Sequence, residues 1–244
     1  IPAKDKINML IFAHRGASKA APENTLKAIS AALQMGAQGI EIDVIQAAGQ
    51  CWVIHDVWVQ RTTNGFGRLD QMTEAQIRQL DAGEGQQVPT FEEVMALTAN
   101  RCLLNIELKG IKDLALFLQQ LDGACERLGI AHQHLLFSSF DHQLLAQLSR
   151  LRPGFAIGAL TASCPLDYAA FAQELGAVSV HMDVAFTSAE FVQDARARGL
   201  KTYVYTVDEP QDMQMLGNWG VDGIFTNVPD KALHWLAESG QQPA

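Results

Sequence analysis

The sequence predicts an α/β fold, a TIM (β/α)8 barrel, from three observations. Short apolar, β-branched runs alternate with helix-like segments along the chain, which is typical of a parallel sheet. Eight such runs occur within 244 residues, which is enough chain for one closed barrel. Glycines, which readily adopt the left-handed conformation that ends a helix, stand shortly before five of the runs. They are Gly36, Gly129, Gly176, Gly199 and Gly220.

The expected strands follow one another with the spacing of βα units. They cover residues 9–13, 39–44, 102–109, 135–138, 155–160, 177–181, 201–207 and 222–226. The first helix should place Leu26, Ile29 and Leu33 on one face, because these positions recur at helical spacing. A last helix over 230–238 would complete the outer ring. The whole chain, residues 1–244, is therefore expected to form a single domain.

One segment interrupts this alternation. An extra apolar run at residues 51–54 follows the second strand after a linker of only four residues. A parallel partner would need a crossover of a dozen residues or more, so this run is expected to turn back as an antiparallel hairpin. Residues 45–89 are accordingly predicted to form an insertion over the top of the barrel.

Composition limits the partners of the chain. The net charge of −9 disfavours nucleic acid or an anionic membrane as the main partner. No apolar run reaches the ~18 residues of a membrane span, so no membrane insertion is expected. The four cysteines, at positions 51, 102, 125 and 164, form no CxxC pair, and three lie in apolar segments. They favour a reducing compartment. A cytoplasmic location is expected, although the chain begins with Ile, and a periplasmic or secreted location stays open; so does the oligomeric state.

Carboxylates alternate with apolar residues on two of the strands. Glu41 and Asp43 share one face of their strand, opposite Ile40, Ile42 and Val44. The apolar face should pack under the helices, so the carboxylates should point into the barrel mouth. Asn105, Glu107 and Lys109 repeat this pattern. The alternative interpretations are carboxylates bridged to Arg or Lys for the first strand and a solvated edge strand for the second.

These residues predict a metal centre. Three carboxylates, Glu41, Asp43 and Glu107, with no clustered Cys or His beside them, are typical ligands for a hard cation. We expect one divalent cation, Mg²⁺ or Ca²⁺, and not zinc.

Two histidines are expected beside this cluster. His14 ends the first strand, and His55 ends the return strand of the hairpin, where the register places it opposite Ile42 within a residue or two. Two imidazoles with an ordinary pKa of ~6.5 can act as base and acid near neutral pH. Arg15, Lys109 and a cation would neutralise a phosphate. The constellation predicts cleavage of a phosphodiester; His181, at another strand end, is a candidate for the pocket wall.

An ordered set of motifs between residues 10 and 230 resembles the glycerophosphodiester phosphodiesterases, which have the barrel of the phosphatidylinositol-specific phospholipases C. His14-Arg15-Gly16 resembles the family's HRG, and residues 22–25 resemble its PENT. Glu41-Ile42-Asp43 and His55-Asp56 resemble its ExD and HD. Residues 105–109 resemble the family's ExK strand, and Ser138-Ser139-Phe140 resembles its SSF. Tyr205-Thr206-Val207-Asp208 resembles its WTVN, and Gly220-Val221-Asp222-Gly223 with Thr226-Asn227 resembles its closing GVDGIxTN.

The resemblance implies hydrolysis of a glycerophosphodiester to glycerol 3-phosphate and an alcohol, within glycerol and lipid metabolism. Metal binding carries over to Glu41, Asp43 and Glu107, acid–base catalysis to His14 and His55, and phosphate binding to Arg15 and Lys109. Phe140 and Tyr205 would contact the glycerol group. The related phospholipases imply attack by the substrate's own hydroxyl through a cyclic phosphate. We favour His14 as base and His55 as acid.

Two positions depart from the family pattern, and two other functions compete with it. Tyr205 stands where the family usually has Trp, and Asp208 where it usually has Asn, which bears on the preference for glycerol and alcohol groups. A Schiff-base aldolase on the same barrel would use Lys109 as nucleophile, but the paired histidines argue against it. A binding module without catalysis would need the cations and not an acid–base pair.

Overall fold

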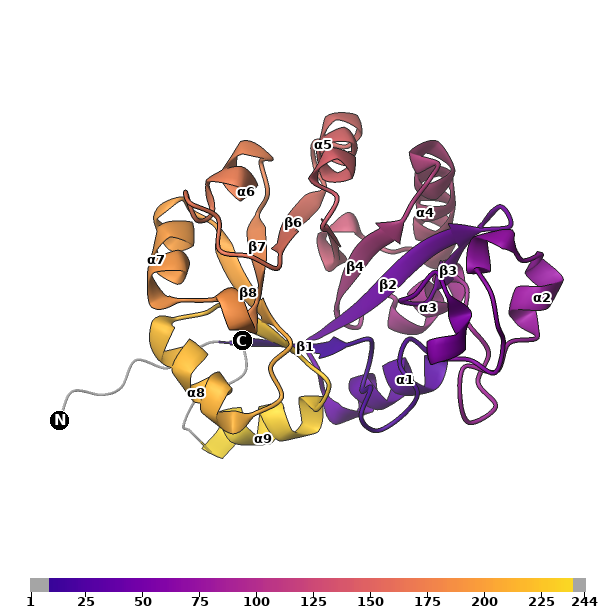
Figure 1. Cartoon of the computed structure of the whole chain (residues 1–244), viewed down its shortest axis with the longest axis horizontal. Helices are drawn as coiled ribbons and strands as arrows, with labels where there is room; N and C mark the ends of the chain where they lie inside the picture. The colour runs from indigo at the N-terminus through magenta and orange to yellow at the C-terminus, as the bar shows by residue number, and fades with distance from the viewer. Residues whose placement is uncertain (1–8, 239–244) are drawn as a thin grey trace.

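A computed structural model describes residues 9–238, and within that range eight parallel strands close into a barrel surrounded by helices (Figure 1). The barrel closes because β1 pairs with both β9 and β2, which confirms the predicted TIM barrel. Its strands are β1 (Leu10–His14), β2 (Gly39–Ala47), β4 (Leu103–Gly110), β5 (Leu135–Ser139), β6 (Ala156–Thr161), β7 (Ser179–Asp183), β8 (Lys201–Tyr205) and β9 (Gly223–Thr226).

Helices follow the strands around the outside. The five glycines expected at helix exits all have positive φ, between 62° and 86°. The helices of the ring are α1 (Leu26–Met35), α3 (Phe91–Thr98), α4 (Leu114–Leu128), α5 (His142–Leu151), α6 (Ala170–Glu174), α7 (Ala189–Ala197), α8 (Pro210–Trp219) and α9 (Pro229–Glu238), with 3-10 turns η3 (His132–His134) and η4 (Val184–Phe186).

Strand bounds differ slightly from the prediction. β2 runs on to Ala47, three residues beyond its expected end, because it continues into the hairpin; β7 starts two residues late and β8 ends two residues early. None of the helices between residues 9 and 238 is long and apolar enough to cross a membrane. Cys51, Cys102 and Cys125 are buried free thiols and Cys164 is exposed. The expected features of residues 1–8 lie outside the described range.

The insertion is built on the predicted hairpin. β3 (Gln50–Val53) runs antiparallel to β2, with Val53 opposite Val44. After β3 come η1 (Val59–Arg61), η2 (Leu69–Gln71) and the short α2 (Glu74–Arg78), at the right of Figure 1. This segment has a small core of its own around Trp52, Val59, Leu69 and Ile77. That core gives the insertion a fixed shape beside the barrel mouth.

The buried face of the first helix overlaps the expected one only in part. Ile29 is buried and Leu33 packs against the core as expected, but Ala28 and Ala32 complete the face and Leu26 is 36% exposed. The helix packs so closely against the loop after β1 that a Cβ on Gly16 would lie 2.6 Å from the carbonyl carbon of Ala28. Small side chains on α1 allow this approach, which the leucine spacing alone does not reveal. The glycine of His14-Arg15-Gly16 is therefore needed to dock α1.

Candidate active site

Strand register brings the carboxylates together at the carboxyl ends of β2 and β4. Asp43 pairs with Glu107, and Glu41 lies between His14 on β1 and Asn105 on β4. Neighbouring strands lie only ~4.8 Å apart, so side chains at paired positions on the same face are close. Glu41 and Asp43 are 3% and 1% exposed. The two acids lie beside Glu107, as the sequence alternation predicted.

Two cations partly neutralise these acids. Lys109 Nζ lies 3.0 Å from Glu107 Oε1 and 3.7 Å from Asp43 Oδ1. The backbone N–H of Arg15 donates to Glu41 Oε2 at 2.9 Å, and Arg15 Nε lies 3.3 Å from Asp43 Oδ2. The alternative of carboxylates bridged to Arg and Lys is therefore present, but it is incomplete. The buried oxygens Glu41 Oε1 and Asp43 Oδ1 have no hydrogen-bond partner among residues 9–238.

The residues fit a divalent cation. One oxygen from each of Glu41, Asp43 and Glu107 lies within 4.8 Å of the others. Burial, together with the charge of Asp43, raises the pKa of Glu107 to about 7 and that of Glu41 well above its ordinary value. A cation would relieve this excess of negative charge and bind the two unpartnered oxygens. Such all-oxygen ligands suit a hard ion.

His14 faces this cluster in a defined tautomer. Its Nδ1 lies 2.9 Å from Asn227 Oδ1, an acceptor, so Nδ1 carries the hydrogen and Nε2 is free. The free Nε2 lies 4.0 Å from Glu41 Oε2. Burial, followed by the charge of Arg15, lowers the pKa of His14 to about 4. This differs from the ordinary value expected from sequence, because an alternating pattern does not reveal how deeply the ring is buried.

The amide that orients His14 is itself fixed by Asp208. One oxygen of Asp208 accepts from the backbone N–H of Asn227 at 2.8 Å and from Thr226 Oγ1 at 3.1 Å, and the other accepts from Asn227 Nδ2 at 2.8 Å. Sequence reasoning noted Asp208 and Asn227 as parts of two motifs and gave neither this role. The signal for this role that the sequence did contain is that the two residues belong to motifs at the ends of neighbouring strands.

His55 lies at the mouth beside a carboxylate partner. The backbone N–H of Ile54 donates to the carbonyl of Asp43 at 3.0 Å, which places His55, the next residue, beside the middle of β2. His55 Nδ1 lies 2.6 Å from Asp56 Oδ1, and this carboxylate accepts the Nδ1–H hydrogen. Burial alone would raise the pKa of Asp56, but hydrogen bonds from Arg61 and His55 outweigh it and lower that pKa.

The loop between β1 and α1 supports the same cluster. Asn24 Nδ2 donates to Asp43 Oδ2 at 2.8 Å, and Arg15 Nη1 donates to Glu23 Oε1 at 2.8 Å. Thr25 caps α1 by accepting from the backbone N–H of Ala28. Arg15 and Asn24 have φ of 59° and 58°, a costly left-handed conformation of the kind that concentrates at functional sites. The Pro-Glu-Asn-Thr segment thus positions residues of the cluster, a role that sequence reasoning did not assign.

A cavity of about 20 Å³ extends from these residues to the other side of the barrel. His14, Glu41 and Glu107 line it on one side, and His181 and Tyr205 on the other. Tyr205 donates its hydroxyl to the carbonyl of Thr161 at 2.9 Å, and its ring meets that of Phe140 edge to face with centroids 6.1 Å apart. Tyr205 and Phe140 thus form one aromatic wall at the mouth.

His181 contributes to the floor of the cavity as a neutral ring. It is fully buried, and burial lowers its pKa to about 3. Its Nε2 lies 2.9 Å from Ser179 Oγ, while Nδ1 has no hydrogen-bond partner in the described part of the chain. A Cβ on Gly158 would lie 2.2 Å from His181 Nε2, so the glycine makes room for the ring.

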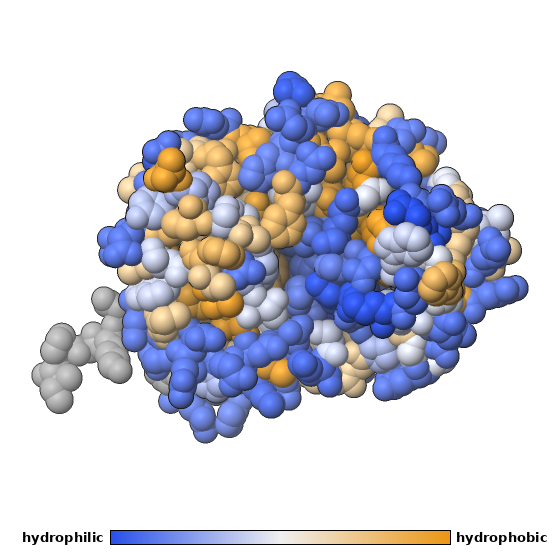
Figure 2. Space-filling view, viewed as in Figure 1, coloured by the Kyte–Doolittle hydropathy of each residue, from blue (hydrophilic) through white to orange (hydrophobic). Residues whose placement is uncertain are grey.

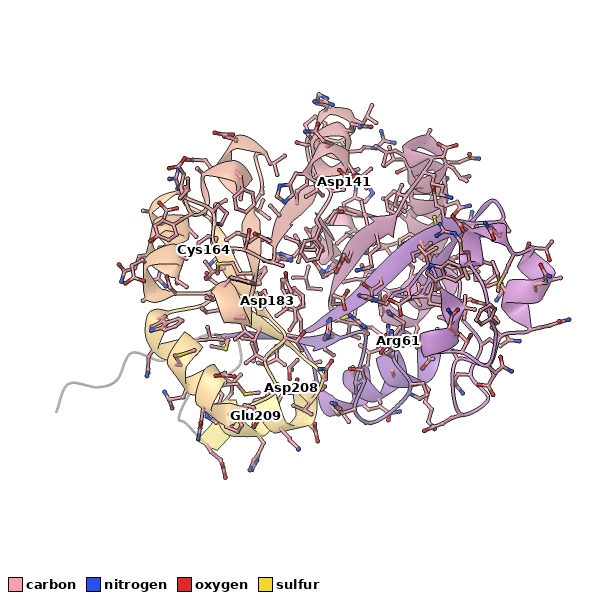
Figure 3. The ribbon with its side chains drawn as sticks, viewed as in Figure 1. Arg61, Asp141, Cys164, Asp183, Asp208 and Glu209 are labelled. Atoms are coloured by element: carbon pink, nitrogen blue, oxygen red, sulfur yellow. The ribbon has the colours of Figure 1, made fainter. Side chains whose placement is uncertain are left out.

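The surface of the mouth also differs between the side of the acid cluster and the side of the aromatic wall. Figure 2 shows a hollow near the centre of the face, with strongly hydrophilic surface toward the insertion and paler, more apolar surface toward the loops after β6 and β7. Figure 3 places Arg61 on the insertion side of this region, with Asp141, Asp183 and Asp208 around the remainder. Charged groups and aromatic groups therefore lie on different sides of one mouth.

The environment of Lys109 argues against the aldolase alternative. Burial alone would lower its pKa, but the charges of Glu107 and Asp43 outweigh it and raise that pKa. A Schiff base forms from the neutral amine, and these carboxylates hold the amine in its charged form. Lys109 is suited to binding an anion and not to acting as a nucleophile.

Known proteins share both the sequence and the architecture. Residues 14–231 match the model of the glycerophosphoryl diester phosphodiesterase family. A glycerophosphodiester phosphodiesterase of Caldanaerobacter subterraneus is 34% identical, over 95% of this chain and 99% of the relative. One from Bacillus subtilis is 31% identical, over 91% of this chain and 84% of the relative.

Solved structures agree. An Oleispira antarctica phosphodiesterase in complex with the product sn-glycerol-3-phosphate superposes with a TM-score of 0.86 at 29% identity, covering 93% of this chain and 96% of that one. A glycerophosphodiester phosphodiesterase from Agrobacterium tumefaciens gives a TM-score of 0.77 at 29% identity, with coverage of 91% and 97%. The chain therefore belongs to the glycerophosphoryl diester phosphodiesterase family and is an enzyme that acts on glycerophosphodiesters.

Proposed function

We propose that this enzyme hydrolyses small, soluble glycerophosphodiesters to glycerol 3-phosphate and an alcohol, using one divalent cation, Mg²⁺ or Ca²⁺, and two histidines. The observation that carries the proposal is the buried cluster of Glu41, Asp43 and Glu107, with two unpartnered oxygens, facing the free Nε2 of His14. Binding alone has no use for a neutral imidazole held in one tautomer at this point. The arrangement therefore favours catalysis over a binding module.

The charged residues would bind the phosphate. Glu41, Asp43 and Glu107 would hold the cation, which supplies Lewis-acid stabilisation of the charge that develops on phosphate oxygens. Arg15 and Lys109 lie against these acids and can turn their remaining N–H groups toward a phosphate. Donors fixed in a partly buried site contribute most where charge increases in the transition state.

The two histidines suit opposite proton transfers. His14, neutral and held by an amide, would take the proton from the substrate hydroxyl adjacent to the phosphate as that oxygen bonds to phosphorus. His55, beside the Asp56 carboxylate, would give its proton to the alcohol oxygen as the phosphorus–oxygen bond to the alcohol breaks. Water then opens the cyclic phosphate with the two roles exchanged. The products are glycerol 3-phosphate and the free alcohol.

Release of glycerol 3-phosphate from glycerophosphocholine tests this proposal. Activity should appear with Mg²⁺ or Ca²⁺ and disappear after exhaustive chelation, because the acid cluster then lacks its cation. Adding back each metal alone should identify which of the two supports turnover. Full activity after chelation would contradict the metal assignment. If glycerol 3-phosphate were released neither with Mg²⁺ nor with Ca²⁺, the proposed reaction itself would be contradicted.

A further inference from the structure

Arg61 connects the insertion to the active site. It ends η1, its side chain is 48% exposed, and its guanidinium lies between two carboxylates, Asp56 and Glu23. Nη1 and Nη2 donate to the two oxygens of Glu23 at 3.1 and 2.8 Å, while Nε donates to Asp56 Oδ2. The planar fork of a guanidinium is suited to bridging two carboxylates in fixed directions. Figure 3 places Arg61 on the insertion side of the mouth.

Each of these carboxylates also holds a residue of the proposed mechanism. Asp56 uses its other oxygen to accept from His55 Nδ1 at 2.6 Å. Glu23 accepts from Arg15 Nη1 at 2.8 Å through the same oxygen that accepts from Arg61 Nη2. The contacts thus form a continuous chain from His55 to Arg15, with the guanidinium of Arg61 at its middle. The chain joins three separate segments: the end of the hairpin, the insertion, and the loop after β1.

Without Arg61, this chain would separate into two parts. Asp56 is about a quarter exposed, and of its partners among the described residues only His55 would remain, so its carboxylate could rotate toward solvent. The His55 ring would lose the partner that fixes its Nδ1–H tautomer. Glu23 would keep Arg15, which is also held by Asp43. The loss should therefore affect His55 more than the phosphate-binding side.

Other arginines of the insertion lie in different surroundings. Arg68 pairs with Asp70 and stacks over Trp58, and Arg78 pairs with Glu93 on α3. These pairs support the insertion without touching His55, Asp56 or Glu23. Arg68 is therefore a matched control for the loss of an exposed arginine from the same segment.

We propose that Arg61 is a positioning residue of the reaction, which fixes Asp56 and, through it, the ring of His55 at a set place relative to Arg15. This inference rests on the proposed function of His55 and Arg15. Arg61 itself is fully engaged with carboxylates and does not need to touch substrate. Its loss should lower kcat with little change in KM, because the Arg15 and Lys109 contacts for the phosphate remain.

Kinetics of Arg61→Ala, Arg61→Lys and Arg68→Ala test the role. Partners that orient an active-site group are commonly worth ten- to a hundredfold, so Arg61→Ala should lose about that much in kcat. Arg61→Lys should recover little, since a point charge cannot bridge both carboxylates, and Arg68→Ala should resemble the wild type. Arg61→Ala combined with Asp56→Asn should lose no more than the larger single effect. Equal kcat for Arg61→Ala and Arg68→Ala, or additive losses, would overturn the proposal.

A second measurement does not depend on turnover. Nitrogen-15 NMR of the imidazoles should show His55 as the Nδ1–H tautomer in the wild type and Arg68→Ala, and as a mixture in Arg61→Ala. If Arg61→Ala does not fold, Arg61→Gln replaces it with a longer neutral side chain. An unchanged His55 tautomer contradicts the positioning role even where kcat falls. Failure of the proposed function would appear separately, as a wild type that releases no glycerol 3-phosphate.

Discussion

The two halves of the barrel mouth differ in the chemistry of their side chains. The half formed by β1, β2, β4 and the hairpin carries buried charges and both proposed catalytic histidines. The half formed by β5 to β8 lacks such buried charges among the described residues. Its loops expose Phe140, Leu166 and Phe186, as the insertion exposes Trp58 and Phe66. The difference agrees with the proposal that the phosphate binds on one side, which leaves the other side for the organic groups of the substrate.

The grouping of the charges has a physical reason. A buried carboxylate is costly unless a cation or hydrogen bonds compensate it, so isolated acids around the mouth would each need a partner. On adjacent strands, Asp43 and Glu107 share Lys109, and Asp43 and Glu41 share Arg15. One compact cluster therefore uses few cations and can hold one metal ion. The apolar half has no such requirement and can vary more freely.

The largest expected effect is on kcat, and it is tested by one substitution in each half of the mouth. His14→Ala removes the proposed base and should lower kcat by roughly 10²–10⁴. Tyr205→Phe keeps the ring and loses only the hydrogen bond to the Thr161 carbonyl, so it should cost no more than about tenfold. Glycerol 3-phosphate release by the two folded variants measures both. A folded His14→Ala enzyme that lost less kcat than Tyr205→Phe would reverse the assignment of chemistry to the charged half.

Asn227 should have an intermediate effect, because it reaches His14 from the end of β9. Asn227→Ala frees His14 Nδ1 and allows the wrong tautomer, so kcat should fall by about ten- to a hundredfold. Ser18→Ala is the control, since it removes only the Ser18 hydroxyl from the same amide oxygen. Steady-state kinetics of both variants measure kcat. Equal losses of kcat would indicate that Asn227 supports the loop and does not orient His14.

The sequence was sufficient for the fold and for the acid cluster. Strand and helix periodicity located all eight barrel strands, because a closed parallel barrel imposes regular spacing on the chain. Alternation on β2 and β4 placed Glu41, Asp43 and Glu107 on inward faces, since side chains of a strand alternate strictly. The alternation of side chains along a strand can therefore predict a site whose residues occupy alternate positions of the same strand.

Features that depend on packing between distant segments were not predictable in this way. Arg61 and Glu23 are 38 residues apart, and no periodicity relates a loop to an insertion. The low pKa of His14 depends on burial by the closed barrel, and the buried face of α1 depends on how closely Gly16 approaches Ala28. The motifs marked these residues as a set, but only the folded chain relates each to its partner.

A smaller effect concerns the floor of the apolar half. The native His181 has a pKa of about 3, whereas the unfolded residue titrates near ~6.5. As pH falls below ~6.5 the unfolded chain takes up a proton that the native protein does not. This residue should therefore lower the free energy of unfolding by about 1.4 kcal/mol per pH unit down to about pH 3. Above pH ~6.5 the contribution of His181 to the free energy of unfolding does not change with pH.

His181→Phe should remove this slope while keeping an aromatic ring above Gly158. Denaturant unfolding of metal-free wild type and variant between pH 4 and pH 8 provides the comparison. The loss of the Ser179 contact adds an offset that does not depend on pH. The groups of the charged half titrate in both proteins and cancel in the difference. Parallel curves across the whole range would show that the native His181 takes up protons as readily as the unfolded one.

The smallest effect should come from the alcohol group of the substrate. Phe186, after β7, is 46% exposed, so a contact between it and the alcohol group would leave much of the ring in water and contribute little binding free energy. The charged half is proposed to bind the phosphate, which every substrate of this class shares. Choline, ethanolamine and glycerol derivatives should therefore differ in kcat/KM by about tenfold, the equivalent of about 1.4 kcal/mol.

Competition among the three glycerophosphodiesters, with a lysophospholipid and phospholipid vesicles as further substrates, measures this preference. The net charge of −9 opposes binding to anionic vesicles, so soluble substrates should be preferred. Phe140→Ala should lower kcat/KM for the three substrates alike, because Phe140, whose ring meets that of Tyr205, is expected to contact the glycerol group that they share. Strict dependence on one alcohol would instead place a specific headgroup site in the apolar half. Faster turnover of vesicles would identify its exposed side chains as a lipid-binding surface, and either result would leave the charged half unchanged.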